Sequence, residues 1–268
     1  LEFRRVLFRS STAEPVTWTY DNTKYWPTEG HIDFLAYAPF DSNQKLKESS
    51  KLDFTVNSTI TAQKDLLWAN AANKTNTDKP VTFIFKHALS RLGYTIKLHD
   101  IYSSAKFTLK KITLAGSSDG TKGAFYTSGT IDLSKATKDA KLWSGQTGKQ
   151  KFDWFSGEYK VTSSTASHPD KVDKGNRDQN EDYLFVIPQD FSQKTTSADA
   201  LYVVVEYTIS YSDQTTMKTK VYKQLDKEFE QGKAYTINLT IGLTPIEFDV
   251  TTVEGWTDIN QVEINSWN

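Results

Sequence analysis

The chain has 268 residues and no cysteine, which excludes disulfides, thiolate nucleophiles and cysteine-based zinc sites. Its 32 lysine and arginine residues nearly balance its 33 aspartate and glutamate residues, so no global field favours nucleic acid or an anionic membrane as a partner. No apolar run reaches the roughly 18 residues that a transmembrane helix needs. Aromatic residues make up 13% of the chain, which favours a core built from strands.

The N-terminal residues differ from the sequence that follows them. The opening letters, LEFRRVLFRS, place three arginines in a short apolar frame, whereas the next segment is rich in Asn, Thr and Ser. We expect residues 1–12 to be a non-native or processed leader remnant. A cloning scar and the remnant of a targeting segment both fit this composition.

Alternating apolar residues predict strands throughout the first half of the chain. A period of two places successive side chains on opposite faces of a sheet. The segments with this pattern are residues 32–37, 81–85 and 94–98. From Phe107 and Leu109 to Ile112 and Leu114 the apolar phase shifts by one residue, which predicts a β-bulge.

The second half of the chain has the same period. Residues 201–211 alternate strictly, a polar turn follows at 212–215, and residues 217–221 alternate again, which predicts an antiparallel hairpin. Two further strands are predicted at residues 235–241 and 246–250. Short strands separated by polar turns favour antiparallel sandwiches over a parallel α/β sheet.

The sequence therefore predicts an all-β fold of two antiparallel β-sandwich domains. Four glycines gather between residues 115 and 135, at positions 116, 120, 123 and 129. We place the domain boundary in this region, with an N-terminal sandwich at residues 13–125 and a C-terminal sandwich at residues 126–268. One or two short helices are expected, at Lys64–Ala72 and at Phe85–Leu92, and the polar segment Thr162–Asp182 is expected to be a long surface loop.

His87, Ser90 and Arg91 lie close together in the sequence and raise the question of a hydrolytic site. A serine nucleophile needs a base, an orienting carboxylate and an oxyanion hole, and no G-x-S-x-G pattern surrounds Ser90. We instead expect a structural role, in which His87 bonds a loop carbonyl, Ala88, Leu89 and Leu92 close the end of a sheet, and Arg91 stays in water. Gly93 is expected to end the turn in a left-handed conformation. No residue is predicted to be catalytic.

Two further groups of residues are candidates for binding. Asp170, Asp173 and Asp178 offer carboxylate ligands for calcium but lack the EF-hand register, and nearby lysine and arginine residues offset their charge. Trp26 and Trp154 lie in polar surroundings and are candidate glycan contacts, because aromatic faces stack on sugar rings. The alternative for such aromatics is that they hold loops over the ends of the core. No phosphate loop or dinucleotide fingerprint occurs, so we expect no cofactor.

Seven segments in a fixed order resemble the fimbrillin (Mfa-like) family of type V pilins. They are KYWP at 24–27, IDFLAYAPF at 32–40, QKDLLWA at 63–69, VTFIFKHALSRLGYTIKL at 81–98, LFVIPQDF at 184–191, LYVVVEYTI at 201–209 and GKAYTINLTIGLTPIEFDVTTVEGW at 232–256. The resemblance runs from about Trp18 to Trp256. It implies two transthyretin-like sandwiches in tandem, in an exported protein, usually a lipoprotein, displayed at the outer membrane.

The resemblance also implies assembly by strand donation. In pilins of this kind a protease, often one that cuts after arginine, removes the first strand, and the groove left behind accepts a strand from the next subunit, which is a form of β-augmentation. Arg9 is the candidate processing site, and either terminus can be the donor. We therefore expect a structural subunit of a surface fimbria, a stalk, anchor or tip, that supports adhesion and pairs with other pilin subunits or with itself. The alternative is an outer-surface glycan-binding lipoprotein of sandwich fold.

Overall fold

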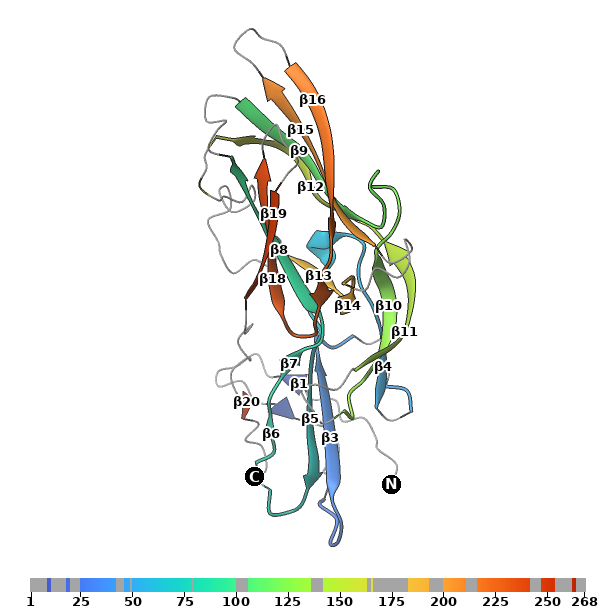
Figure 1. Cartoon of the computed structure of the whole chain (residues 1–268). Coiled ribbons are helices and arrows are strands. Elements are labelled where there is room, and N and C mark those ends of the chain that lie inside the picture. The colour runs from blue at the N-terminus through green and yellow to red at the C-terminus, as the bar shows by residue number, and fades with distance from the viewer. Residues whose placement is uncertain are drawn as a thin grey trace.

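Strands dominate the protein, and the predicted all-β class is confirmed (Figure 1). The computed structural model describes residues 25–41, 46–48, 50–78, 80–99, 106–135, 142–162, 165, 183–192, 200–210 and 216–241 in full, and the backbone of residues 9–10, 18–19, 247–253 and 262–263. Within these residues the single helical element is a 3-10 turn, η1, at Ile60–Ala62. The molecule is elongated, with its larger sheets toward one end and smaller ones toward the other.

The strand bounds follow the alternation of the sequence. The strands are β1 Arg9–Ser10, β2 Trp18–Thr19, β3 Ile32–Ala38, β4 Lys51–Thr55, β5 Leu67–Lys74, β6 Thr82–Phe83, β7 Lys86–His87, β8 Ser90–Leu98, β9 Lys106–Ala115, β10 Phe125–Asp132, β11 Trp143–Gln150, β12 Phe152–Val161, β13 Leu184–Val186, β14 Gln189–Asp190, β15 Leu201–Ser210, β16 Thr216–Leu225, β17 Glu228–Phe229, β18 Ala234–Ile241, β19 Glu247–Val253 and β20 Val262–Glu263.

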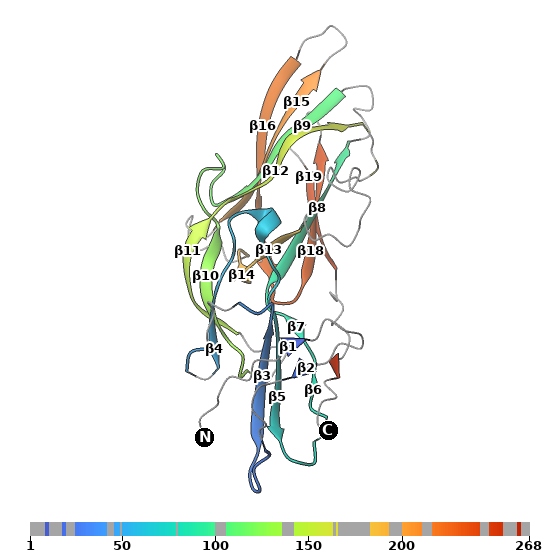
Figure 2. The same cartoon turned by 180° about the vertical axis from the view of Figure 1, so that it is seen from behind.

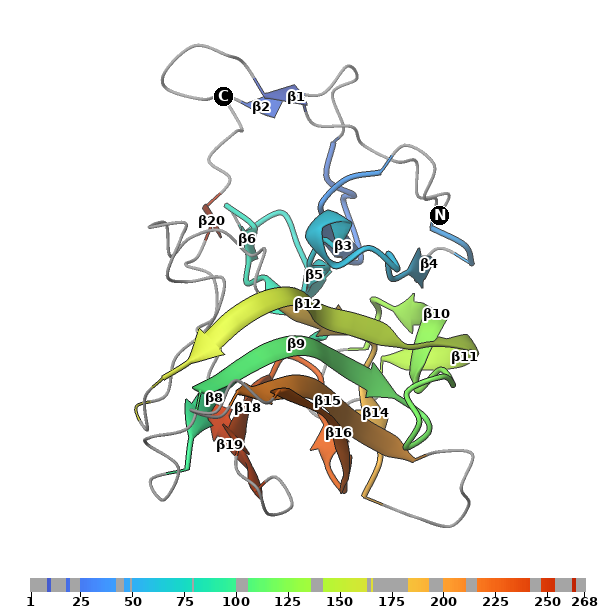
Figure 3. The same ribbon diagram turned by 90° about the horizontal axis from the view of Figure 1, so that it is seen from above.

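Two four-stranded sheets form the main sandwich. One has the order β12-β9-β15-β16 and the other β13-β8-β18-β19. Figure 3 shows the first sheet curving over the second. Alternate residues of β8, β15 and β18 are buried between the layers, among them Val203 and Val205 of β15 and Ile237 and Leu239 of β18. This burial is what a period of two produces when one face of each sheet covers the other.

An aromatic cluster closes one end of this sandwich. The ring of Phe125 at the start of β10 lies 5.8 Å from that of Phe152, 5.4 Å from Phe191 and 6.2 Å from Phe229. Phe229 in turn meets Tyr235 edge to face at 5.1 Å. Because the strands that carry these rings belong to several sheets, the cluster joins the sheet β11-β10-β4 and the pair β14-β17 to the main sandwich.

The narrow end of the molecule is built from short strands. The sheet β3-β5-β7 and the pair β20-β6 lie there, below the main sandwich in Figures 1 and 2. Leu35 and Tyr37 of β3 and Trp68 of β5 pack against the common core. The chain leaves this region through His87 and enters the sandwich as β8.

The predicted hairpin and the predicted bulge are both confirmed. β15 pairs with β16 in an unbroken antiparallel register from Leu201 opposite Leu225 to Ser210 opposite Thr216. In the neighbouring pair, Glu206 lies opposite Lys111 and Tyr207 opposite Leu109, so β9 has one extra residue at that point. The extra residue shifts the buried positions from Phe107 and Leu109 to Ile112 and Leu114, as the apolar phase of the sequence indicates.

Both predicted helices are wrong. Lys64–Ala72 includes most of β5, and Phe85–Leu92 contains β7 and the start of β8. Ala and Leu favour helices when isolated, but here β5 pairs with β3 on one side and with β7 on the other. The stabilisation from strand pairing and burial outweighs differences in helix propensity, which are roughly a few tenths of a kcal/mol per residue.

Strands from both sides of residue 125 share the sheets of the main sandwich. β8 pairs with β18 over eight residues, from Arg91 opposite Ala234 to Leu98 opposite Ile241, and this pairing is parallel in a mostly antiparallel protein. β9 lies between β12 and β15. The division into units at residues 13–125 and 126–268 stays a prediction, because strand pairing does not establish which segments fold on their own.

Most of the predicted loop at 162–182 lies outside the described residues.

Candidate functional site: the open edge of β5 and the groove beside it

The His87 segment is a structural junction in which His87 and Ser90 have different partners. His87 is buried, and its Nδ1 bonds the carboxylate of Asp65, a partner that the sequence did not single out. The Ser90 hydroxyl donates to the carbonyl oxygen of Glu230 at 2.7 Å. Ala88 and Leu89 are fully buried, as expected for residues that close the end of a sheet. The burial of Ala88 and Leu89 agrees with the predicted closing of the sheet end, whereas the bond shown for His87 is to a side-chain carboxylate and the sequence predicted a loop carbonyl.

Three backbone contacts tie the same junction to distant parts of the chain. The N–H of Ala88 donates to the Leu66 carbonyl at 2.8 Å, and the Ala88 carbonyl accepts the indole N–H of Trp143 at 2.8 Å. The N–H of Gly232 donates to Leu89 at 3.0 Å. The junction therefore joins β5, β11 and the turn before β18.

Two details of this junction differ from expectation. Gly93 lies inside β8, where a Cβ atom would come within 3.3 Å of the Tyr183 ring, so it extends the strand and does not end a turn. The guanidinium of Arg91 stacks on that same ring at 4.3 Å and is partly buried. Burial lowers the pKa of Arg91 from its usual value. Arg91 thus packs on the protein and does not remain in water.

The two tryptophans proposed as glycan contacts have different surroundings. Trp26 is half-buried and meets the ring of Phe34 edge to face at 5.8 Å. Trp154 is only 7% exposed and packs against Tyr94 at 4.9 Å in the core between the sheets. The indole N–H of Trp143 donates to the carbonyl oxygen of Ala88. This contact fits the alternative role for such aromatics, in which the ring holds a loop at the end of the core.

The remaining candidate residues stay predictions. Asp170, Asp173 and Asp178 lie outside the described residues, and no cluster of metal-binding side chains occurs among the residues that are described. Arg9 is in β1, where it lies opposite Thr19 of β2. Of the helical segments in the described part of the chain, none is long and apolar enough to cross a membrane.

An incompletely paired strand at the narrow end of the molecule is the feature that sequence reasoning missed. β5 pairs with β3 along most of its length, but in the described residues its other side pairs with β7 only at Leu67 and Trp68. Beyond Trp68 the edge from Ala69 to Asn73 lies beside β6, and no ladder joins this edge to another described strand. A strand was hard to predict there because LWANAANK has no apolar alternation.

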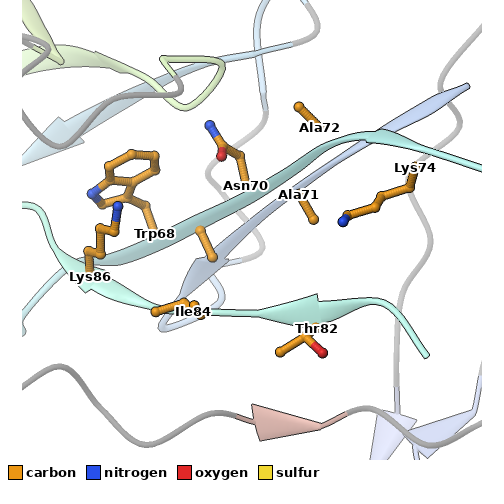
Figure 4. A pocket seen from close by; sticks show the side chains of 9 residues that line it. Trp68, Asn70, Ala71, Ala72, Lys74, Thr82, Ile84 and Lys86 are labelled. Atoms are coloured by element: carbon orange, nitrogen blue, oxygen red, sulfur yellow. The ribbon is translucent and has the colours of Figure 1, made fainter. Parts of the chain in front are cut away.

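A groove of about 320 Å³ follows this open edge (Figure 4). β5 forms one wall, and the chain from β6 to β7 forms the other. The lining residues are Trp68, Ala69, Asn70, Ala71, Ala72, Lys74, Thr82, Ile84 and Lys86. Ile84 is 46% exposed, so the groove presents an apolar side chain to its opening.

The groove carries positive charge and an unused donor. Lys74 and Lys86 line it, and within the described part of the chain no aspartate or glutamate does. The Lys86 ammonium lies 5.6 Å from the centre of the Trp68 ring. The indole N–H of Trp68 is buried without a hydrogen-bond partner among the described residues, a situation that costs about 1–3 kcal/mol for an unsatisfied polar group.

The wall of the groove is held in place by neighbouring contacts. The side-chain amide of Asn70 donates to the carbonyls of Leu133 and Lys135 at 3.1 and 3.0 Å, which fixes the centre of β5. The Lys74 ammonium lies 4.0 Å from Asp78, whose pKa is lowered because it accepts hydrogen bonds from the backbone and the hydroxyl of Thr75. The open edge is therefore part of an ordered wall.

Together these features define a class of protein: an all-β protein of stacked sheets, with an open strand edge beside a basic groove. The chain belongs to the fimbrillin-like family, whose sequence profile matches residues 3–256. The match confirms the resemblance seen in the sequence. It also includes most of residues 1–12, whose composition differs from that of the sequence that follows. Family membership points to a structural rather than a catalytic protein.

Comparison with solved structures supports the fold. A candidate cell adhesion protein from Bacteroides uniformis is similar, with a TM-score of 0.50 and 20% identity over 93% of this chain and 84% of the other. Another, from Bacteroides ovatus, has a TM-score of 0.46 and 16% identity over 91% and 76% of the two chains. At such identities the likeness shows the fold alone, and the argument rests on the first structure. Among curated proteins, none matches the chain.

Proposed function

We propose that this chain is a structural subunit of a fimbria or fimbria-like appendage that pairs with neighbouring subunits by β-strand donation and supports adhesion. Membership of the fimbrillin-like family supports the fimbrial role. The fold likeness to a candidate cell adhesion protein supports adhesion as the role further downstream. Stalk, anchor and tip positions all fit the proposal.

The open edge of β5 is the observation that carries the proposal. An unpaired strand edge presents N–H and C=O groups that another chain can satisfy, and most proteins protect such edges with lysine, proline or bulges. The outer strand β16 has three lysines, at 218, 220 and 223, and the outer strand β12 contains two irregularities in its register with β9. In contrast, Ala69–Asn73 carries no charged side chain. Of these edges, β5 is the one best suited to receive a strand.

The same proposal assigns a location and partners. The protein is exported and displayed at the outer membrane, and it binds other pilin subunits or further copies of itself. Surface glycans and surface proteins of a host or of other bacteria are the candidate adhesion targets. Processing after Arg9 is the step that prepares the subunit for assembly.

Assembly of the purified chain tests this proposal. We expect an arginine-specific protease to leave a new N-terminus at Ser10 and to convert monomers into oligomers, as measured by size-exclusion chromatography with light scattering and by negative-stain microscopy. The Arg9→Gln variant is the control, because it should resist cleavage at that bond and remain monomeric. On cells, antibody to this chain should label filaments.

Two results together would overturn the proposal. The first is cleavage after Arg9 that leaves a monomer at every concentration tested. The second is antibody labelling of cells that marks the surface evenly, without filaments. A chain that behaves in this way is a solitary surface protein.

Glycan binding is the second candidate function, and the exposed ring of Tyr25 favours it. Tyr25 is 86% exposed beside the half-buried Trp26, and aromatic faces can stack on sugars. A glycan array should then show saturable binding by the monomer that Tyr25→Ala and Trp26→Ala abolish. Absence of binding, or binding that is indifferent to both substitutions, would remove this candidate.

A further inference from the structure

Two hydrogen-bond donors lie next to each other at the β7 end of the groove. One is the buried indole N–H of Trp68, which has no partner among the described residues. The other is the ammonium group of Lys86, 5.6 Å from the centre of the same ring. Figure 4 shows the indole nitrogen on the side of the ring that is nearer to Lys86. Both groups can only donate, so a single acceptor placed between them would satisfy both.

The charge of the groove indicates which acceptor fits. Among the described residues, two lysines and no acidic residue line it. Lys74, at the far end of β5, has Asp78 at 4.0 Å, and Asp78 lies outside the lining. A carboxylate placed between Trp68 and Lys86 would accept from both donors and offset the positive charge, and hydrogen bonds to ionised groups are stronger than neutral ones. A neutral acceptor would satisfy the indole but would leave the charge unbalanced.

The backbone of the groove indicates what carries the carboxylate. From Ala69 to Asn73 the edge of β5 that faces the groove makes no ladder within the described residues. Successive main-chain groups along such an edge match the spacing of an extended peptide. A free sugar acid could supply a carboxylate, but it could not pair with a run of backbone groups.

We propose that the groove selects an extended segment of a neighbouring subunit that carries an aspartate or glutamate side chain, with the carboxylate bound between Trp68 Nε1 and Lys86 Nζ. This inference rests on the proposed function, because the segment is a donated strand, and it adds the chemistry that identifies the partner. Main-chain pairing with β5 provides affinity for the donated segment. The basic end of the groove selects segments with an acidic residue and fixes their register along β5.

Short peptides of alternating valine and threonine with one central residue changed provide the test. The central residue is Glu, Gln or Lys, and binding to the purified full chain is followed by calorimetry at low salt. We expect the Glu peptide to bind about five- to tenfold more tightly than the Gln peptide, as for a partly desolvated ion pair, and the Lys peptide to bind most weakly. High salt should narrow the difference between them.

Three variants locate the effect. Lys86→Gln should abolish the preference for Glu over Gln, and Lys86→Glu should reverse it in favour of the Lys peptide. Trp68→Phe, which keeps most of the ring packing but removes the N–H, should weaken binding of the Glu peptide. Lys218→Gln is the matched control, because Lys218 lies on β16, away from the groove. Circular dichroism and thermal unfolding confirm that each variant folds.

The possible results separate this inference from the proposed function. Equal binding of the Glu and Gln peptides overturns acid selection and leaves strand donation standing. Lys86-dependent binding of glucuronate without binding of any peptide overturns the inference in favour of a small anionic ligand. Failure of all peptides to bind also overturns it, and strand donation is then judged by the assembly experiment alone.

Discussion

Trp154 and Trp26 show how local sequence and tertiary environment diverge at single residues. Both lie in polar stretches of the sequence, yet Trp154 is 7% exposed and packs on Tyr94, whereas Trp26 is half-buried beside Phe34. In a strand the neighbours of a core residue point to the opposite face, so polar neighbours do not indicate exposure. The scaffold role of Trp154 follows from which face of β12 meets β8.

Replacing Trp154 should therefore destabilise the protein strongly. We expect Trp154→Ala to lower the free energy of unfolding by about 3–5 kcal/mol, because it removes a large ring from a packed core and leaves a cavity. Urea denaturation followed by circular dichroism measures the change. Trp26→Ala, at the half-buried position, is the comparison and should cost clearly less. Equal losses for the two variants would contradict the placement of Trp154 in the core.

The proposed function depends on strand edges. Some of these edges carry charged side chains that hinder pairing with another chain, and the edge of β5 from Ala69 to Asn73 does not. β16 is the last strand of its sheet in the described part and carries lysines at 218, 220 and 223. The Lys220 ammonium donates to the carbonyl of Asp119 at 2.8 Å, which holds the turn after β9 against this strand. β5 has no such protection from Ala69 to Asn73. This asymmetry fits a subunit that must pair at one edge and avoid pairing at another.

Removing charge from β16 tests the protective role of its lysines. We expect the double substitution Lys218→Val and Lys223→Val to make the chain self-associate at concentrations where the parent is monomeric, because charged side chains hinder edge-to-edge pairing. Light scattering coupled to size-exclusion chromatography measures the molecular mass. Lys122→Val, at an exposed turn position, is the control for a general loss of charge. A double variant that remains as monomeric as this control would argue against the role.

At the scale of the whole molecule, the main sandwich is assembled from distant parts of the chain. β8 forms its parallel ladder with β18, and β9 is held between β12 and β15. Ser90 adds a side-chain hydrogen bond to Glu230 across 140 positions of sequence. A chain cut near residue 125 would separate β8 and β9 from most of these partners.

Fragment experiments show what this connectivity means for folding. If the shared strands make the chain one folding unit, residues 13–125 and residues 126–268 produced separately should lack a cooperative unfolding transition, and the two fragments mixed or co-expressed should form a folded complex. Differential scanning calorimetry and circular dichroism follow the transitions, with the intact chain as the reference. Two fragments that each unfold cooperatively would instead support independent domains on either side of residue 125.

The amino-acid sequence by itself determined the all-β class, most of the long strands, the hairpin of β15 and β16 and the bulge in β9. This was possible because alternation with a period of two shows which side chains of a strand are buried. The alternation can be seen within one segment, whichever strand pairs with it. The order of seven segments also indicated the fimbrillin-like family. The core of the junction at Ala88 and Leu89 was recognisable for the same reason, since apolar residues there had to cover the end of a sheet.

Only the tertiary structure decided which strands pair and where an edge stays open. LWANAANK has no period and favours a helix locally, yet pairing with β3 makes it a strand. The glycines taken as a boundary include Gly123, where a Cβ atom would come within 2.4 Å of the Lys149 carbonyl, so a close backbone approach accounts for that residue. The groove could not be foreseen either, because it exists where β5 and β6 fail to pair, and contacts between segments leave no periodic signal in the sequence of either one.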